Sequence, residues 1–364
     1  MRIVVKIGTS SVTDEHGSIK NAAIRALCEQ VARVRGEGNE VIVVTSGAIA
    51  GGVGALGLKQ RPTDTQTLQA LAAVGQSQLM NKYNEHLASH GLVGAQVLLV
   101  PNDFIDRTQY LHARQTLVRL LELGCVPIIN ENDAIASDEI RFGDNDRIAA
   151  LVAHSVSADV LVLLTDIAGL FTADPRIDAS ATFIEQVAAD DPLLSVRASA
   201  SSTARGSGGM SSKLSAARIA SWSGVRTVIA DATKTDVVVH ALAQTPGAGT
   251  QFLPHNRNLS ARKLWIAFAA QQSGVIVVDA GAKQALIERN TSLLHAGVAE
   301  VQGDFAEGDT VEIQDLSGVV FARGMVSVSA VHASAAAGRK STELPDGVVA
   351  ELVHRDDLVV LVDQ

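Results

Sequence analysis

Residues 2–10 read Arg-Ile-Val-Val-Lys-Ile-Gly-Thr-Ser, an apolar run that closes on a lysine, a glycine and two hydroxyl residues. Five further apolar runs follow within the first 230 residues, and helical patterns lie between them. Strands buried on both faces have near-continuous apolar sequences of this kind. The alternation predicts an α/β domain with a mainly parallel central sheet and helices on both faces.

The expected strands are 2–7, 40–45, 96–100, 126–130, 160–165 and 227–230. The expected helices are 22–36, 67–90, 108–123, 146–155 and 212–224. Ligands of such sheets bind at the carboxyl ends of the strands. Polar residues that directly follow a strand are therefore the candidates for a functional site.

The pattern changes near residue 244. Residues 244–272 look like a linker, and short strands with turn signals follow from 273 to the end. These are expected at 274–279, 298–302, 310–314, 319–323, 326–329 and 358–362, with one helix at 281–289 and a short flexible segment at 333–338. This predicts a small β-rich, barrel-like domain. The expected organisation is a first domain over 1–243, a linker over 244–272 and a second domain over 273–364.

The composition limits the possible functions. A chain of 364 residues can build two domains, and 47% hydrophobic with 3% aromatic residues indicates aliphatic packing. Cys28 and Cys125 are expected to be reduced core residues, and no apolar run is long enough to span a membrane. We expect a soluble cytoplasmic protein. The net charge is −9, and residues 273–364 carry 14 acidic and 6 basic residues, which argues against binding to a nucleic-acid backbone.

A glycine-rich loop precedes the last helix of the first domain, at Gly206-Ser-Gly-Gly-Met-Ser-Ser-Lys213. Glycines let backbone N–H groups approach an anion, a helix N-terminus adds positive potential, and a lysine supplies full charge. Together with Lys6 and Gly8, this loop suggests a polyphosphate held from two sides. Each motif taken alone is also compatible with an ordinary Gly/Ser turn.

A second glycine-flanked helix start follows the second strand, at Thr45-Ser-Gly-Ala-Ile-Ala-Gly-Gly52. It would allow close approach of a carboxylate or phosphate, and tight helix–sheet packing is the alternative. Gly52-Val-Gly-Ala-Leu-Gly57 formally matches a dinucleotide fingerprint, but it begins too far beyond the strand and lacks the acidic residue after a second strand. A Rossmann dehydrogenase is therefore a weak rival, and no P-loop sequence occurs.

Three more polar clusters lie at expected strand or helix ends. Asn130, Asn132 and Asp133 follow one strand, where a carboxylate could pair with a substrate ammonium and the amides could orient a carboxylate. An Asx turn is the alternative. The run Gly143-Asp-Asn-Asp146 offers more residues than one helix cap needs, and an aspartate near two lysines would orient them. Thr165 and Asp166 could meet a nucleotide or a metal-bound water.

With these residues in place, the chain resembles the glutamate 5-kinase family over nearly its whole length. The sequence motifs on which this resemblance rests are Val-Val-Lys6-Ile-Gly-Thr-Ser, Val-Thr-Ser46-Gly-Ala-Ile-Ala, Ala-Val-Gly-Gln76, Ile-Asn130-Glu-Asn-Asp133-Ala, Gly-Asp144-Asn145-Asp146, Leu-Leu-Thr165-Asp166, Thr-Ala-Asp-Pro-Arg176 and Gly-Gly-Met-Ser-Ser-Lys213. The resemblance implies an amino-acid-kinase fold, a three-layer sandwich, followed by a PUA-like barrel.

The resemblance also implies residue roles. Lys6 and Lys213 would flank the transferred phosphoryl group, and Asp146 would organise them. The implied glutamate-binding residues are Ser46, Asp133 and Asn145, with Asn130 and Asp144 as neighbours. The implied ATP-binding residues are Lys6, Gly8, Thr165, Asp166, Ser207, Gly208, Gly209, Met210, Ser211, Ser212 and Lys213. Ser207 and Ser212 stand where threonine is common and Arg205 precedes the loop, which leaves its conformation and the effector response open.

The implied reaction is ATP-dependent phosphorylation of the γ-carboxylate of L-glutamate, with Mg²⁺ on the ATP. The implied partners are L-proline as feedback inhibitor, γ-glutamyl phosphate reductase as metabolic partner, and further copies of the chain in a dimer or tetramer. Nucleic acid and membrane are not expected partners. The rival readings are a sister kinase, such as an acetylglutamate kinase or aspartokinase, and an RNA-binding protein with a vestigial kinase domain. The barrel could also serve as an interaction or regulatory module.

Overall fold

The computed structural model describes residues 1–14, 16–135, 145–173, 175, 177–178, 180–189, 191, 209–255, 259–269, 272–344 and 349–361. The chain forms two compact units, Met1–Asn258 and Leu259–Gln364. Within the described ranges, no helix is both long and apolar enough to cross a membrane.

The first unit is built on an eight-stranded sheet with the order β3-β4-β2-β1-β5-β9-β10-β8. The strands are β1 (Arg2–Ile7), β2 (Glu40–Val44), β3 (Gly94–Leu99), β4 (Val126–Glu131), β5 (Val160–Thr165), β8 (Gln186–Val187), β9 (Arg226–Asp231) and β10 (Thr250–Phe252). Strands β1 to β5 and β9 pair in parallel, whereas β10 pairs antiparallel with β9 and parallel with β8. The mainly parallel sheet expected from the apolar runs is confirmed.

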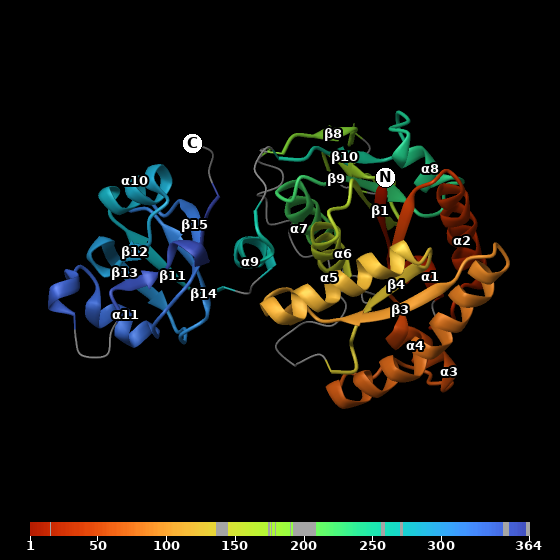
Figure 1. Cartoon of the computed structure of the whole chain (residues 1–364), viewed down its shortest axis with the longest axis horizontal. Coiled ribbons are helices and arrows are strands. Elements are labelled where there is room, and N and C mark those ends of the chain that lie inside the picture. Colours follow the sequence, from red (N-terminus) through yellow and green to blue (C-terminus); the bar gives the residue numbers. More distant parts are fainter. Residues whose placement is uncertain are drawn as a thin grey trace. The chain divides into compact units, whose positions relative to one another are not determined.

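Helices cover both faces of this sheet (Figure 1). They are α1 (Thr9–Val12), α2 (Asn21–Gly36), α3 (Ala48–Ala55), α4 (Thr65–Ala88), α5 (Arg107–Glu122), α6 (Asn145–Ser155), α7 (Met210–Ser221) and α8 (Val237–Leu242), with a 3-10 turn at Pro101–Phe104. Helices α2, α4 and α8 share one hydrophobic core with alternate residues of the central strands. Helix α6 packs on β1 and β5, and α7 packs on β9. A small hairpin of β6 (Leu170–Phe171) and β7 (Phe183–Ile184) lies outside the main sheet.

Strand order explains where a ligand would bind. The chain passes from β1 to β2 on one side of β1, and β5 then pairs with the other side. Crevices open at the carboxyl ends of parallel strands where the order reverses in this way. The ends of β1, β2, β4 and β5 carry the polar residues singled out in the sequence, so the topology gathers them along one edge of the sheet.

The second unit centres on a five-stranded sheet with the order β13-β11-β14-β15-β17. Its elements are α9 (Ala261–Leu264), a π-helical turn (Trp265–Ala269), β11 (Gln272–Val278), α10 (Ala280–Arg289), β12 (Leu293–Leu294), β13 (Val298–Gly303), β14 (Thr310–Gln314), β15 (Val320–Met325), α11 (Ala330–Ala336), β16 (Glu351–Val353) and β17 (Leu358–Val360), with 3-10 turns at His295–Gly297, Ser341–Glu343 and Arg355–Asp357. Strands β12 and β16 form a separate antiparallel pair. The expected β-rich second domain is confirmed, and it has its own core.

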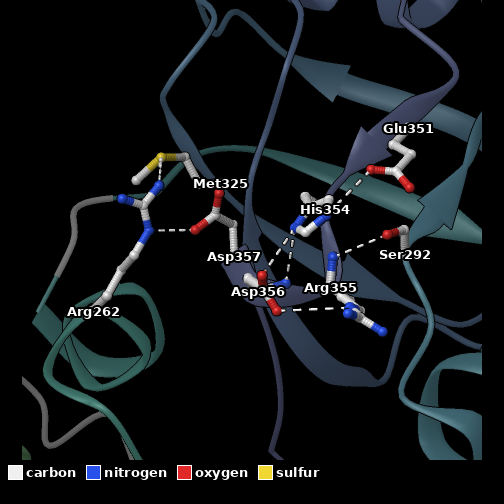
Figure 2. Close-up of polar contacts among 8 residues, drawn as sticks. All are labelled: Arg262, Ser292, Met325, Glu351, His354, Arg355, Asp356 and Asp357. Carbon is white, nitrogen blue, oxygen red and sulfur yellow. Dashed lines mark hydrogen bonds and ion pairs between the residues drawn. The ribbon is translucent and has the colours of Figure 1, made fainter.

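Polar contacts hold helix α9 within this second unit. The Arg262 side chain contacts the carboxylate of Asp357 and the sulfur of Met325 (Figure 2). In the same view, His354 precedes the 3-10 turn and its Nδ1 accepts from the Asp356 N–H at 3.2 Å. The His354-Arg-Asp356 triplet, which superficially resembles a protein-kinase motif, is thus part of a local turn.

Two expectations for the second unit are wrong. Residues 326–329 do not form a strand, because the ladder with β14 ends at Met325 and the chain then turns toward α11. Residues 333–338 are not a flexible segment, since Ala330–Ala336 form α11 and Ala333 and Ala336 are buried. The expected linker over 244–272 also contains regular structure, because Thr250–Phe252 forms strand β10 of the first sheet.

Candidate active site

Lys6 lies on β1 and faces away from the core formed with α2, α4 and α8. Ile3, Val5 and Ile7 belong to that core, and side chains alternate along a strand. Lys6 therefore shares the other face with Val4, toward helix α6. Its ammonium group is taken out of water, because the residue is only 4% exposed. A buried lysine needs a charged partner to remain ionised.

Asp146 supplies that partner from the first turn of α6. Its Oδ1 lies 2.7 Å from Lys6 Nζ, and its Oδ2 lies 3.0 Å from Lys213 Nζ in the first turn of α7. The Ser212 hydroxyl donates to the same Oδ2 at 2.7 Å. Asp146 is 1% exposed and Lys213 is 4% exposed. Two lysines from distant parts of the chain thus meet on one buried carboxylate.

Electrostatics keeps the carboxylate of Asp146 ionised in this cluster, Lys6–Asp146–Lys213. Burial alone would raise the pKa of Asp146, but the charges of Lys6 and Lys213 and the hydrogen bonds from Lys6 and Ser212 outweigh it and hold the pKa below its usual value. Two ammonium groups thus share one carboxylate. The cluster can therefore attract an anion while its lysines stay fixed in position.

Ser46 and Gly47 form the corner between β2 and α3. Gly47 has a left-handed backbone with φ of +100°, and Ser46 is buried beside it. The following glycines serve helix packing, since a Cβ at Gly52 would lie 2.1 Å from the Leu71 carbonyl oxygen of α4. The sequence allowed two interpretations of this segment, an anion site or tight helix–sheet packing. Close packing explains Gly52, but α3 packs there against helix α4 and not against the sheet. Ser46 remains available at the N-terminus of α3.

The two asparagines expected in the site meet at the end of β4. Asn130 Oδ1 and Asn145 Oδ1 both accept from the Glu131 N–H at 3.0 Å, which ties the start of α6 to the strand. Asn130 Nδ2 donates to Gln76 Oε1 of α4 at 2.8 Å. Gln76 was not among the expected site residues, although it lies in one of the motifs that carry the family resemblance. Gln76 thus supports Asn130 from α4, on the face of the sheet away from α6.

Asp133 lies just beyond β4 and is 6% exposed. Its Oδ1 is buried without a hydrogen-bond donor among the described residues. Burial raises the pKa of Asp133 to about 6, although the charge of Arg61 acts in the opposite direction. A buried carboxylate with an open acceptor atom is suited to a cationic ligand group. The Asx-turn alternative does not explain this orphan oxygen.

The remaining candidate residues surround the cluster from the sheet edge and from α7. Gly8 follows Lys6, and a Cβ there would lie 3.6 Å from Lys6 Nζ without clashing with the protein. A side chain at this position would thus occupy space next to the ammonium group. Thr165 ends β5, and its hydroxyl donates to Asp166 Oδ1 at 3.1 Å. Gly209 caps α7, whose first turn contains Met210, Ser211, Ser212 and Lys213. Asp144, Ser207 and Gly208 lie outside the described residues.

The described residues do not cluster as the protein ligands of a divalent cation would. They contain no group of three or more His, Cys, Asp or Glu side chains that could hold a metal ion. Asp146, the carboxylate closest to the lysines, already has its oxygens directed at Lys6 and Lys213. Mg²⁺ commonly binds through substrate phosphates and water with few protein ligands. These residues are compatible with Mg²⁺ that is carried on the phosphates of a nucleotide.

Comparisons with known proteins agree with this geometry. Residues 1–231 match the amino acid kinase family, and residues 274–348 match the PUA domain. The glutamate 5-kinase of Thermobifida fusca (strain YX) is 45% identical, covering 99% of this chain and 93% of that protein. Those of Ralstonia pickettii (strain 12J) and Thermoanaerobacter sp. (strain X514) are each 44% identical over 99% of this chain, and the matches cover 97% and 98% of those proteins. The chain belongs to the amino acid kinase family and, within it, to the glutamate 5-kinases.

Proposed function

We propose that the chain transfers the γ-phosphoryl group of ATP to the γ-carboxylate of L-glutamate, giving L-glutamyl 5-phosphate and ADP, the first step of proline biosynthesis from glutamate. The observation that carries this proposal is the buried cluster of Lys6, Asp146 and Lys213 at the carboxyl edge of the sheet. The names of the relatives, which match over almost the whole chain, support the same reaction.

The chemistry of the nucleophile explains the residue types present. A γ-carboxylate is already ionised at neutral pH, so the enzyme needs no general base. The main obstacle is repulsion between two anions, together with the charge that spreads over the transferring phosphoryl group. Lys6 and Lys213 would neutralise this charge from opposite sides. Asp146 touches both ammonium groups and would hold them in position.

Substrate selection would rest on Asp133. Its buried carboxylate with an open Oδ1 would pair with the free α-ammonium of glutamate. An N-acylated amino acid has no such charge and would leave Asp133 unpaired. Ser46 and the amide groups of Asn130 and Asn145 would orient the substrate, with Asp144 assigned by the family resemblance alone.

The nucleotide would lie along the edge formed by the ends of β1 and β5 and the start of α7. Gly8 leaves space next to Lys6, and the N-terminus of α7 would direct backbone N–H groups toward a phosphate. Thr165 and Asp166 would contact the nucleoside, and Ser207, Gly208 and residues 209–213 would contact the phosphates. Mg²⁺ would be carried on the ATP phosphates and would supply further neutralisation there.

The family resemblance supports several expectations about the setting of this reaction. They are a cytoplasmic location, a homo-dimer or homo-tetramer, feedback inhibition by L-proline and transfer of the labile acyl phosphate to γ-glutamyl phosphate reductase.

Trapping of the product tests the proposal. The purified protein is incubated with Mg·ATP, hydroxylamine and either L-glutamate, N-acetylglutamate or L-aspartate. We expect γ-glutamyl hydroxamate from glutamate and at most trace product from the other two. Hydroxamate from N-acetylglutamate or aspartate alone would reassign the protein to a sister kinase, and ATP binding without any hydroxamate would refute the proposed reaction.

A further inference from the structure

Two buried hydroxyl groups tie the corner between β2 and α3, which is expected to hold glutamate, to helix α4. The phenolic oxygen of Tyr83 lies 2.9 Å from Oγ1 of Thr45. The Thr45 hydroxyl in turn donates to the Ser46 carbonyl oxygen at 3.3 Å. Thr45 and Tyr83 are both 0% exposed. The proposed reaction assigns no role to either residue.

The chemistry of the three groups sets the direction of these hydrogen bonds. A carbonyl oxygen can only accept, so the single proton of the Thr45 hydroxyl is used on Ser46. Oγ1 of Thr45 must then accept from Tyr83, whose O–H is the donor of that pair. Tyr83 therefore restricts the rotation of the Thr45 hydroxyl and keeps its proton directed at the Ser46 carbonyl.

The alternation of side chains along β2 places Thr45 and Ser46 on opposite faces of the sheet. Val41 and Val43 belong to the core shared with α4, and the Thr45 side chain meets α4 on that same face. The Thr45 N–H also continues the ladder to β4, so the extended backbone reaches this residue. Ser46 therefore begins on the other face of the sheet, the face of Lys6.

The peptide bond that follows Ser46 carries the effect of the two hydroxyls to the substrate corner. Its carbonyl is turned toward Thr45, and in a planar trans peptide the N–H points the opposite way. That N–H belongs to Gly47, and it makes no hydrogen bond to any residue that the structure describes. The Gly47 N–H is thus directed away from α4 as a donor without an acceptor in the protein.

Given the proposed function, we infer that Tyr83 is a positioning residue for the binding of glutamate. Through Thr45 it holds the Ser46 carbonyl away from the substrate, so that the Gly47 N–H donates to a carboxylate of glutamate. A hydrogen bond to a charged acceptor is stronger than one between neutral groups. A rotated peptide would instead present its carbonyl oxygen to this anion and repel it. Tyr83 itself is buried on α4 and touches no substrate.

Removal of the two hydroxyl groups, singly and together, tests this inference. We would measure kcat and the KM values for glutamate and ATP in the wild type, Tyr83→Phe, Thr45→Val and the double variant. Thr45→Ser keeps the hydroxyl and is the conservative rescue. Tyr110→Phe is the matched control, because Tyr110 is the chain's other tyrosine, lies half-buried on α5, and has a hydroxyl without a hydrogen bond among the described residues.

Tyr83→Phe and Thr45→Val are expected to raise KM for glutamate by about 3- to 10-fold, the range of one neutral hydrogen bond. Both kcat and the KM for ATP should change less than about twofold, and Thr45→Ser and Tyr110→Phe should resemble the wild type. The double variant should bind glutamate no more weakly than Thr45→Val alone, because Tyr83 acts only through Thr45.

Three results would overturn the inference. They are equal increases in the KM values for glutamate and ATP, effects that add in the double variant, and matching effects of Tyr83→Phe and Tyr110→Phe. A wild type that forms no hydroxamate from glutamate would instead overturn the proposed function, and the inference with it.

Discussion

Asp133 combines burial with an acceptor atom that has no hydrogen-bond donor among the described residues. Because burial raises its pKa to about 6, the group ionises close to the physiological range. Below that pH it gains a proton and can no longer pair with an ammonium group. We predict that kcat/KM for glutamate falls about tenfold per pH unit below 6, with KM carrying the change. Asp133→Asn should give a low and nearly flat profile between pH 5 and 8.

The raised pKa of Asp133 also predicts an effect on stability. Stability should fall as pH rises, whereas glutamate binding should improve. The pKa of Asp133 is higher in the folded than in the unfolded chain, so its ionisation destabilises the fold as pH rises from about 4 to 6. Asp133→Asn should therefore raise Tm at pH 8 while it weakens glutamate binding. A Tm that falls at pH 8, in a variant with unchanged secondary structure, would contradict the burial argument.

The lysine cluster predicts an unequal response to removal of its members. Asp146→Asn removes the carboxylate that contacts both ammonium groups, whereas Lys213→Met keeps the ion pair of Lys6 with Asp146. Breaking a buried ion pair so that a charge is left unpaired costs about 3–5 kcal/mol. Urea unfolding should show a loss of that size for Asp146→Asn and a much smaller loss for Lys213→Met. The reverse order would contradict the charge balance proposed for the site.

The main contacts of the site could be predicted at the level of single residues, because parallel strands bring their carboxyl ends to one edge. Lys6, Asp146 and Lys213 follow this rule and do meet, while their catalytic roles stay predictions. Gln76 was not predicted as a site residue because it lies on a helix and contacts Asn130, and does not follow a strand end.

At the scale of elements, the contact between α3 and α4 decides where Ser46 lies. A Cβ on Gly75 would fall 1.8 Å from the Ala48 carbonyl oxygen and 2.4 Å from the Gly52 nitrogen, so no side chain fits between these helices. Gly75→Ala should destabilise the protein by about 3 kcal/mol and raise KM for glutamate, because α3 must move. Urea unfolding and steady-state kinetics measure the two effects.

Gly36→Ala is the matched control for this prediction. Gly36 ends α2, and a Cβ there meets nothing within 4 Å. The substitution should be neutral or slightly stabilising, since alanine restricts the unfolded chain. If Gly75→Ala were as well tolerated as Gly36→Ala, the close helix contact could not be what positions the substrate corner.

The elements of the first unit were largely predictable because its central strands are buried on both faces, which leaves a continuous apolar signature. Helix α7 shows the limit of this approach, since it starts at Met210, two residues before the expected start. In the second unit the signals are weaker. The alanine-rich α11 has small side chains that bury little area, so its sequence resembles a flexible segment.

At the scale of the whole molecule, two separate cores predict two unfolding events. Leu79 belongs to the core of the first unit and Phe321 to that of the second. Truncation of such buried side chains to alanine costs about 2–5 kcal/mol. Calorimetry should show two transitions, with Leu79→Ala lowering one and Phe321→Ala lowering the other. A single transition that shifts equally in both variants would show that the units unfold as one.

The central claim is that the lysine cluster stabilises the transferring phosphoryl group, and single-turnover kinetics with Lys213→Met tests it most directly. With saturating Mg·ATP and glutamate, the phosphoryl-transfer step should slow by about 100- to 1,000-fold, as expected for loss of one transition-state contact. The Kd for ATP should change much less, and Lys82→Met, which alters an exposed ion pair on α4, should match the wild type. A Lys213→Met protein that transfers the phosphoryl group at nearly the wild-type rate would contradict the account.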